Sequence, residues 1–295
     1  MASVSIVIPT RDRPQQLLVG IASIVAGERR PDEIVVADQS AGAAASIPET
    51  AGVDIVHLRL TSVGSSTARN AAILAARGDV LVFLDDDVRV APDWLRRIVD
   101  ALGAAPPRSV VTGAVLSDDV GGGHVPSLKS QTAPATFSGR LFSDPLFAGN
   151  MALRRAAFDE VGLFDERLGA GAAFPAAGDN DLGYRMLEAG YEIAYVPDAV
   201  VYHGGARHGS GLARLDWSYG RGQGAFYAKH MSWSDRHMLR RLRRNAAYRL
   251  RRALPALRGD RQALREVIYL GGLISGVLGW RRRFGSRREP APPAS

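Results

Sequence analysis

The sequence contains no cysteine among its 295 residues. This absence excludes disulfide scaffolds, thiol catalysis and zinc sites built on cysteine. No apolar run is long enough to span a bilayer comfortably. No Gly-x-Gly-x-x-Gly follows the first predicted strand and there is no Gly-Lys-Ser/Thr motif, so neither a dinucleotide fold nor a P-loop is supported. The N-terminus enters a strand pattern within a few residues and leaves no room for a signal peptide, so we expect a cytoplasmic location.

Basic residues are abundant, almost all of them arginine, and the net charge is +7. A tract near the C-terminus concentrates this charge in Arg236, Arg240, Arg241, Arg243, Arg244, Arg249, Arg251, Arg252 and Arg258. Such a tract favours a partner with phosphates, either a nucleic acid or an anionic membrane surface. No aromatic-basic RNA motif or DNA-reading module accompanies the charge, so we expect no nucleic acid.

Strand and helix patterns alternate through the first part of the chain. Strands are predicted at 3–9, 32–38, 53–58, 80–84 and 109–116, and helices at 15–26, 65–76 and 93–102. This rhythm predicts an α/β fold with a mostly parallel sheet covered by helices on both faces.

The pattern changes after residue 116. A Gly, Pro, Ser and Thr-rich loop with Gly121–Gly123 fills 117–143, and loops of this length are usually functional or mobile. Order resumes at 146–153 and 156–161, and a helix at 181–189 and a strand at 191–196 follow a second loop at 169–178. Residues 212–258 and 263–283 are predicted to be helical, and the Pro-rich tail from 287 to 295 is predicted to be disordered.

The most informative stretch is the apolar strand from Val80 to Leu84, which ends in three consecutive aspartates. Adjacent carboxylates repel one another unless a cation lies among them. Oxygen ligands favour a hard divalent cation, Mg²⁺ or Mn²⁺, and ligands in open α/β sheets collect at the carboxyl ends of strands. The alternative is a solvated turn in which Asp86 or Asp87 caps the next helix.

Other polar residues also follow predicted strands. Arg69 and Asn70 lie on the helix before the aspartates, and two further groups follow the first and the second strand, namely Pro9, Thr10, Arg11, Asp12 and Arg13, and Asp38, Gln39 and Ser40. Together they predict a site for a phosphorylated ligand at one edge of the sheet.

Five ordered blocks of this sequence resemble those of family 2 glycosyltransferases with the GT-A fold. The blocks are VSIVIPTRDRP, DEIVVADQS, VGSSTARNAAILAARGDVLVFLDDDV, FAGNMALRRAAFDEVGLFDERLGAG and GDNDLGYRMLEAGYEIAYVPDAVVYH, and together they cover about residues 3–205. The resemblance implies an inverting transferase that uses a nucleotide-diphospho-sugar donor and a hydroxyl acceptor, in the synthesis of cell-surface polysaccharide, glycolipid or glycoconjugate.

The resemblance also assigns the donor side of the site. Asp38 matches the acid that binds the nucleotide base, with Ala37 where the family often has a second acid. The other donor-binding matches are Pro9, Thr10, Arg11, Asp12, Arg69, Asp85 and Asp86. Asp85 and Asp87 match an Asp-x-Asp motif and, with His203, would hold Mg²⁺ or Mn²⁺ against both phosphates.

The acceptor side follows from the later blocks. Asp179 matches the aspartate of a Glu-Asp pair and would be the general base, although Gly178 replaces the glutamate. Gly149 and Asn150 match the strand beneath donor sugar and acceptor, and Asp181 matches a residue that borders the acceptor or supports the helix. We therefore divide the chain into a donor half at 1–116, an acceptor and catalytic half at 117–211, a basic helical extension at 212–284 and a tail at 285–295.

The apolar stretch from Val267 to Trp280 leaves two possibilities open. Its four glycines favour close helix packing, within the domain or in a homodimer. Its flanking arginines favour an interfacial helix on the inner face of the cell membrane, which would suit a lipid-linked or wall-associated acceptor. We therefore expect a glycan or a lipid-linked acceptor. The rival functions are a nucleotidyltransferase acting on sugar phosphates and a non-enzymatic basic binding protein with a degenerate donor site.

Overall fold

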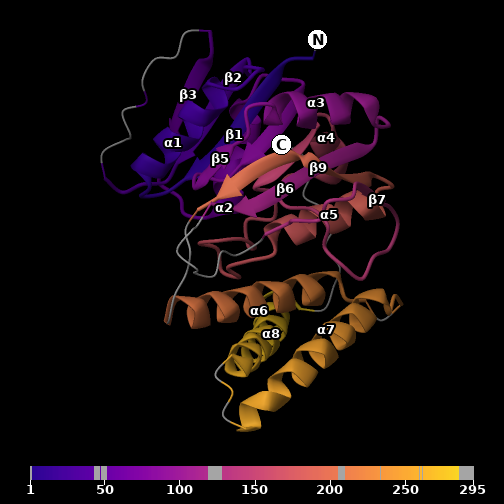
Figure 1. Ribbon diagram of the computed structural model, residues 1–295. Coiled ribbons are helices and arrows are strands. Elements are labelled where there is room, and N and C mark those ends of the chain that lie inside the picture. The colour runs from indigo at the N-terminus through magenta and orange to yellow at the C-terminus, as the bar shows by residue number, and fades with distance from the viewer. Residues whose placement is uncertain are drawn as a thin grey trace.

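The computed structural model describes residues 2–42, 47, 52–118, 128–204, 210–232, 234–258, 260 and 262–285. The glycine triplet at 121–123 and the tail at 287–295 lie outside the described residues. One mixed sheet with helices on both faces forms the upper part of the molecule, and three long helices form a layer beneath it (Figure 1).

The first half of the sheet is parallel, as predicted. Its strands are β1 (Val4–Thr10), β2 (Glu33–Asp38), β3 (Asp54–Arg59) and β4 (Val80–Leu84), in the order β3-β2-β1-β4. Every residue of β2 and β4 is buried, which explains their continuous apolar runs. Because these strands are parallel, the loops that follow β1, β2 and β4 open at one edge of the sheet.

The second half continues the same sheet. β8 (Asn150–Arg154) runs antiparallel to both β4 and β6 (Ser109–Ser117), and β6 is parallel to β9 (Glu192–His203). Two short strands, β5 (Val88–Val90) and β7 (Ala135–Phe137), pair antiparallel with β9 and were not predicted, because three residues carry too little periodicity. β9 runs past its predicted end at Val196, since a register shift after Gly113 accommodates Pro197.

Helices cover both faces of this sheet. α1 (Pro14–Val25) and α3 (Trp94–Ala104) bury their apolar side chains on one face, with Trp94 at the centre of that core. α2 (Ser65–Ala75), α4 (Ala157–Val161) and α5 (Gly178–Glu188) cover the other face around Phe83 and Phe164. The predicted α/β class is therefore confirmed.

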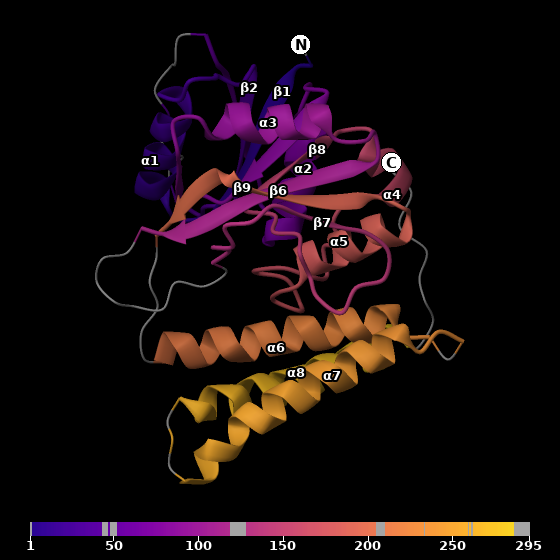
Figure 2. The same ribbon diagram turned by 45° about the vertical axis from the view of Figure 1, so that its right-hand side comes forward.

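The helical layer consists of α6 (Ser210–His230), α7 (His237–Ala253), the short 3-10 helix η1 (Leu254–Arg258) and α8 (Ala263–Phe284), and it lies below α5 in both views (Figure 2). α6 and α8 cross closely at four glycines. A Cβ atom at Gly220 or Gly224 would lie 2.1 Å from a carbonyl oxygen of α8, and one at Gly276 would lie 2.0 Å from the carbonyl oxygen of Arg221. The glycines of the C-terminal stretch therefore serve packing within this chain.

Candidate active site

A pocket of about 760 Å³ opens between the carboxyl edge of the sheet and the helical layer. Its walls come from the loops after β1, β2 and β4, from the start of α5, and from α6. The structure brings together in it the predicted site residues Pro9, Thr10, Arg11, Arg69, Asp85, Asp86, Asp87, Gly149, Asp179 and His203.

Asp85, Asp87 and His203 form a group that could hold a metal ion. One possible ligand atom from each lies within 4.8 Å of the others, and His203 Nε2 is 3.3 Å from Asp87 Oδ1. The short strand β5 explains this proximity, because its register places Val88 opposite His203 on β9. The alternative role for Asp87 as a helix cap is wrong, since β5 separates it from α3.

The residues present fit a divalent cation. Burial raises the pKa values of both Asp86 and Asp87, neighbouring aspartates add to this, and the positive charge of Arg13 only partly opposes it. Within the described residues, the buried Nδ1 of His203 has no hydrogen-bond partner, so protein contacts do not satisfy both nitrogens of this ring. Two carboxylates and an imidazole suit Mg²⁺ or Mn²⁺ that keeps further positions for phosphate oxygens.

Arg13 supplies the existing counter-charge; the sequence placed it at this edge of the sheet but assigned it no individual role. Its Nη1 donates to Asp86 Oδ1 at 2.9 Å and to Asp87 Oδ2 at 2.7 Å, and the Thr10 hydroxyl donates to Asp86 Oδ2 at 2.8 Å. Arg13 directly precedes α1, so a loop residue that follows β1 orients the aspartates that follow β4. The parallel pairing of β1 with β4 brings the two loops to the same edge of the sheet, where this contact forms.

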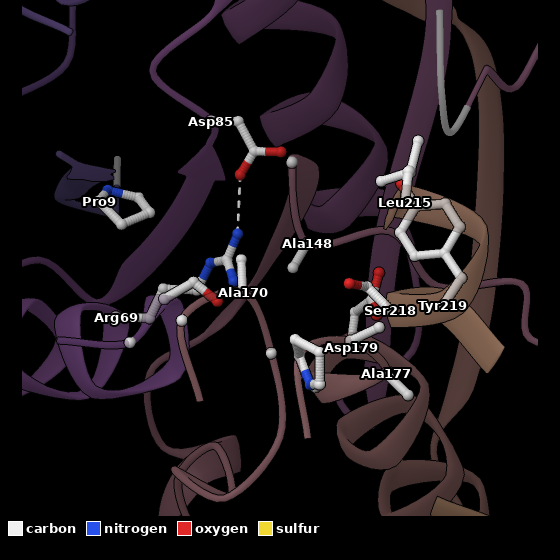
Figure 3. A pocket seen from close by; sticks show the side chains of 18 of the residues that line it. Pro9, Arg69, Asp85, Ala148, Ala170, Ala177, Asp179, Leu215, Ser218 and Tyr219 are labelled. Carbon is white, nitrogen blue, oxygen red and sulfur yellow. Dashed lines mark hydrogen bonds and ion pairs between the residues drawn. The ribbon is translucent and has the colours of Figure 1, made fainter. Parts of the chain in front are cut away.

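Asp85 and Arg69 form one wall of the pocket, and the dashed line in Figure 3 marks their 2.7 Å ion pair. The guanidinium of Arg69 also lies 5.6 Å from the centre of the Phe164 ring, which fixes its position. Gly149 has no side chain for a steric reason, because a Cβ there would come within 2.5 Å of Asp85 Oδ2. A larger residue at 149 would displace a predicted metal ligand.

Asp179 lies on the facing wall, beside Ser218 and Tyr219 of α6 (Figure 3). It belongs to the first turn of α5, where the backbone N–H of Asn180 donates to its Oδ1 at 3.0 Å. Burial raises the pKa of Asp179, and the positive charge of Arg69 only partly opposes the shift. A half-buried carboxylate with a raised pKa is more basic than an ordinary aspartate and suits proton abstraction.

Two residues predicted to border the acceptor are engaged by protein partners in the structure. The carboxylate of Asp181 is fully buried and engaged by Arg185 at 2.9 Å, Lys229 at 2.6 Å and His230 at 2.7 Å. Asn150 is equally buried. Its Nδ2 donates hydrogen bonds to the carbonyl oxygens of Ala114 and Ala199, and its Oδ1 accepts one from the indole N–H of Trp94. These contacts agree with the supporting role considered for Asp181, and a contact of either side chain with an acceptor stays a prediction.

Asp12 and Asp38 lie at the predicted edge but outside the lining of this pocket. Burial acts to raise the pKa of Asp38, but hydrogen bonds from Ser40, His57 and Arg59 outweigh it and leave that pKa lowered. The amide of Asp12 donates to the Ser40 hydroxyl at 2.8 Å, which ties the loop after β1 to the loop after β2. Their roles toward the nucleotide stay predictions.

Gln39 was noted from the sequence after the second strand without an individual role, whereas the lining residues of the helical layer were not predicted. Gln39 is 8% exposed, its Oε1 accepts from the Gly64 amide at 3.1 Å, and its Nε2 has no partner within the described residues. From the helical layer come Leu215, Ser218, Tyr219, Gln223, Arg249 and Tyr269. No local pattern marks these side chains, because their place in the wall depends on how the layer packs on the sheet.

Two solved structures share the α/β fold described above over most of this chain. The mannosyltransferase of Pyrobaculum calidifontis in complex with GDP-Man and Mn²⁺ gives a TM-score of 0.61 at 16% identity, over 94% of this chain and 88% of that one. Staphylococcus aureus TarS 1–349 in complex with UDP-GlcNAc gives 0.60 at 17% identity, over 93% of this chain and 81% of that one.

Curated relatives are more similar in sequence. The pre-mycofactocin glycosyltransferase of Mycobacterium tuberculosis is 28% identical over 219 residues, which cover 68% of this chain but only 42% of that relative's length. Succinoglycan biosynthesis protein ExoM of Rhizobium meliloti is 28% identical over 94% of each chain. The model of the family described as "Glycosyl transferase family 2" matches residues 5–162, more than half of the 295 residues. This chain therefore belongs to glycosyl transferase family 2.

Proposed function

We propose that the protein transfers a sugar from a nucleotide-diphospho-sugar to a hydroxyl acceptor, with inversion at the anomeric carbon. The observation that carries this proposal is that the group Asp85, Asp87 and His203 and the basic carboxylate of Asp179 line one pocket. A site for the donor's diphosphate and a base for the acceptor's hydroxyl are the two components such a transfer needs. Family membership supports the proposal.

The donor would lie along the loops that follow β1, β2 and β4. Asp85, Asp87 and His203 would hold Mg²⁺ or Mn²⁺, which supplies positive charge against the diphosphate as it departs. Arg69 and Arg13 would orient Asp85 and Asp87 through their ion pairs. The solved relatives with UDP-GlcNAc and with GDP-Man and Mn²⁺ support this class of donor and cofactor.

Asp179 would accept the proton of the attacking hydroxyl. Attack on the face of the sugar opposite the departing diphosphate forms one bond and breaks one, so the configuration at the anomeric carbon inverts. Arg69 and Lys129, whose positive charges act on Asp179, favour the ionised form that can accept a proton. Gly149, next to Asp85, would leave room for the sugar itself.

The acceptor would enter from the side of the helical layer. Leu215, Tyr219 and Tyr269 provide apolar and aromatic surface there, which suits the faces of sugar rings in a glycan or a lipid-linked acceptor. The proposed role is in cell-surface polysaccharide, glycolipid or glycoconjugate synthesis, and the similar protein named for succinoglycan biosynthesis supports a role in glycan synthesis.

The direct test is a thermal-shift screen of UDP-, GDP- and dTDP-sugars with and without Mn²⁺, followed by product analysis. A donor at about 100 times its Kd stabilises the fold by about 2.7 kcal/mol, which raises the melting temperature. We expect a shift that requires the cation, and release of a nucleoside diphosphate when an acceptor is present. Formation of a nucleoside triphosphate and a sugar phosphate from the donor and added pyrophosphate would indicate a nucleotidyltransferase, and no shift with any donor would overturn the proposal.

A further inference from the structure

The helix α8 has two opposite faces with different surroundings. On one face Gly272, Gly276 and Leu273 pack against α6, and Trp280 is buried against Phe174. Other parts of the same chain therefore cover this face of α8. By length and composition α8 could cross a membrane, but to do so it would have to leave this packing.

The other face of α8 is apolar and exposed. Leu264, Val267, Ile274 and Leu278 recur at helical spacing and are 47%, 47%, 60% and 49% exposed. Trp217 of α6, itself 41% exposed, lies against this face, because a Cβ at Gly271 would meet its ring at 3.1 Å. No charged residue occurs between Val267 and Trp280, so the face is continuous over nearly four turns.

Exposed arginines adjoin this apolar face at both ends of α8. At its C-terminal end Arg281, Arg282 and Arg283 are all exposed. Toward its N-terminal end, the last turn of α7 and η1 present exposed Leu250, Arg251, Leu254 and Leu257. Arg240, Arg243 and Arg244 are also exposed, in the first half of α7. Within the described residues, none of these four α7 arginines pairs with an acid.

Acidic residues are nearly absent from this surface. From Arg236 to Gly259 the sequence has no aspartate or glutamate, and α8 has only Glu266. Glu266 is 7% exposed and is neutralised by Arg249 and Arg252, each at 2.8 Å. The surface therefore combines exposed apolar side chains with uncompensated positive charge.

We propose that this surface, the exposed face of α8 with Trp217 and the flanking arginines, docks the protein on an anionic lipid bilayer. Apolar side chains would enter the boundary between headgroups and acyl chains, the arginines would contact anionic headgroups, and Trp217 would lie at headgroup level. A second copy of the chain fits less well, because its identical arginines would face these without acids to pair with them.

The inference deepens the proposed function by naming where a lipid-linked acceptor would be met. Residues 215, 218 and 219 of α6 line the pocket, and residue 217 of the same helix lies on the docking surface. A bilayer on that surface would therefore lie next to the helix that forms one wall of the pocket.

Vesicle flotation tests the proposal without donor, acceptor or activity, so its failure is distinct from failure of the proposed transfer. We expect binding to vesicles with 30% phosphatidylglycerol, weak binding to pure phosphatidylcholine, and a decrease in high salt. The double substitution Ile274→Glu and Leu278→Glu should lower the partition coefficient at least tenfold. The matched control is Leu74→Glu, since Leu74 of α2 is 62% exposed and lies away from the surface.

A second variant tests the charges. Replacing Arg281, Arg282 and Arg283 by glutamine should lower binding to anionic vesicles on the order of 100-fold, about fivefold for each arginine. Equal binding to both lipid types, no binding to either, or binding unchanged in both variants would overturn the proposal. Recovery that resists salt and alkaline extraction would instead indicate a spanning helix, and dimerisation abolished by the double substitution would indicate a second copy.

Discussion

Asp179 and Asp181 lie two residues apart at the start of α5, and the fold gives their carboxylates opposite properties. Asp179 borders the pocket, and burial raises its pKa. Burial acts on Asp181 in the same direction, but Lys229, Arg185 and His230 outweigh it and hold the pKa of Asp181 well below its usual value. The first carboxylate is therefore suited to proton transfer, whereas the second stays ionised and ties α5 to α6.

Asp179→Asn should preserve donor affinity and lower kcat by about 10²–10⁴-fold, because the amide keeps the shape but cannot accept a proton. In the wild type, kcat should fall as the pH drops through the pKa of Asp179, because only the ionised carboxylate can accept a proton. Burial raises this pKa, so the fall should begin at a higher pH than for an ordinary aspartate. Donor titrations and pH–rate profiles of both proteins check this. If the variant loses donor binding while turnover per bound donor is unchanged, Asp179 is structural and the base lies elsewhere.

Asp87→Ala should abolish cation-dependent donor binding and leave the fold intact, because it removes a ligand and relieves repulsion between adjacent carboxylates. Isothermal titration of the donor with and without Mn²⁺ measures the effect, and circular dichroism checks the fold. Asp100→Ala is the control, since that side chain is 61% exposed on α3. Turnover of the variant at the wild-type rate in saturating Mn²⁺ would contradict the metal assignment.

At the scale of elements, the crossing of α6 and α8 depends on residues without side chains. Gly276→Ala should lower the free energy of unfolding by about 1–3 kcal/mol, because its Cβ would lie 2.0 Å from the carbonyl oxygen of Arg221 and force the helices apart. Gly103→Ala makes the same change on α3, where a Cβ meets nothing within 4 Å, and should be stabilising by about 0.4–1 kcal/mol. Urea denaturation of both variants measures the difference, and equal stabilities would show that the crossing is loose.

For the molecule as a whole, the pocket is complete only when the helical layer lies against the sheet. Tyr219→Ala should raise the KM for the acceptor about tenfold and leave the donor Kd unchanged, since a contact with a substrate's apolar surface is worth about 1–3 kcal/mol. Steady-state kinetics with varied acceptor, and a donor titration, separate the two effects. A weaker donor affinity with an unchanged acceptor KM would assign this wall to the donor instead.

The sequence alone predicted the parts of this protein that depend on neighbouring residues. A continuous apolar run marks β4 as a buried strand, and parallel strands must end at one edge, so Asp85 and Asp87 could be placed there before any contact was known. Asp179 was assigned by its resemblance to a family motif, and the structure places it in the same pocket.

Tertiary structure alone decided which polar side chains other parts of the protein engage. Asn150 and Asp181 have the same chemistry as the other predicted site residues, but partners from β6, β9 and α6 engage them, and these lie 36 to 49 residues away. Arg13 and Tyr219 belong to the site only because distant elements pack together. The same holds for α8. In the sequence its glycines and leucines form one apolar stretch, and only the packing of α6 decides which face is covered and which is exposed. The physical reason is that local patterns determine which elements form, whereas burial and the pairing of polar groups depend on the whole chain.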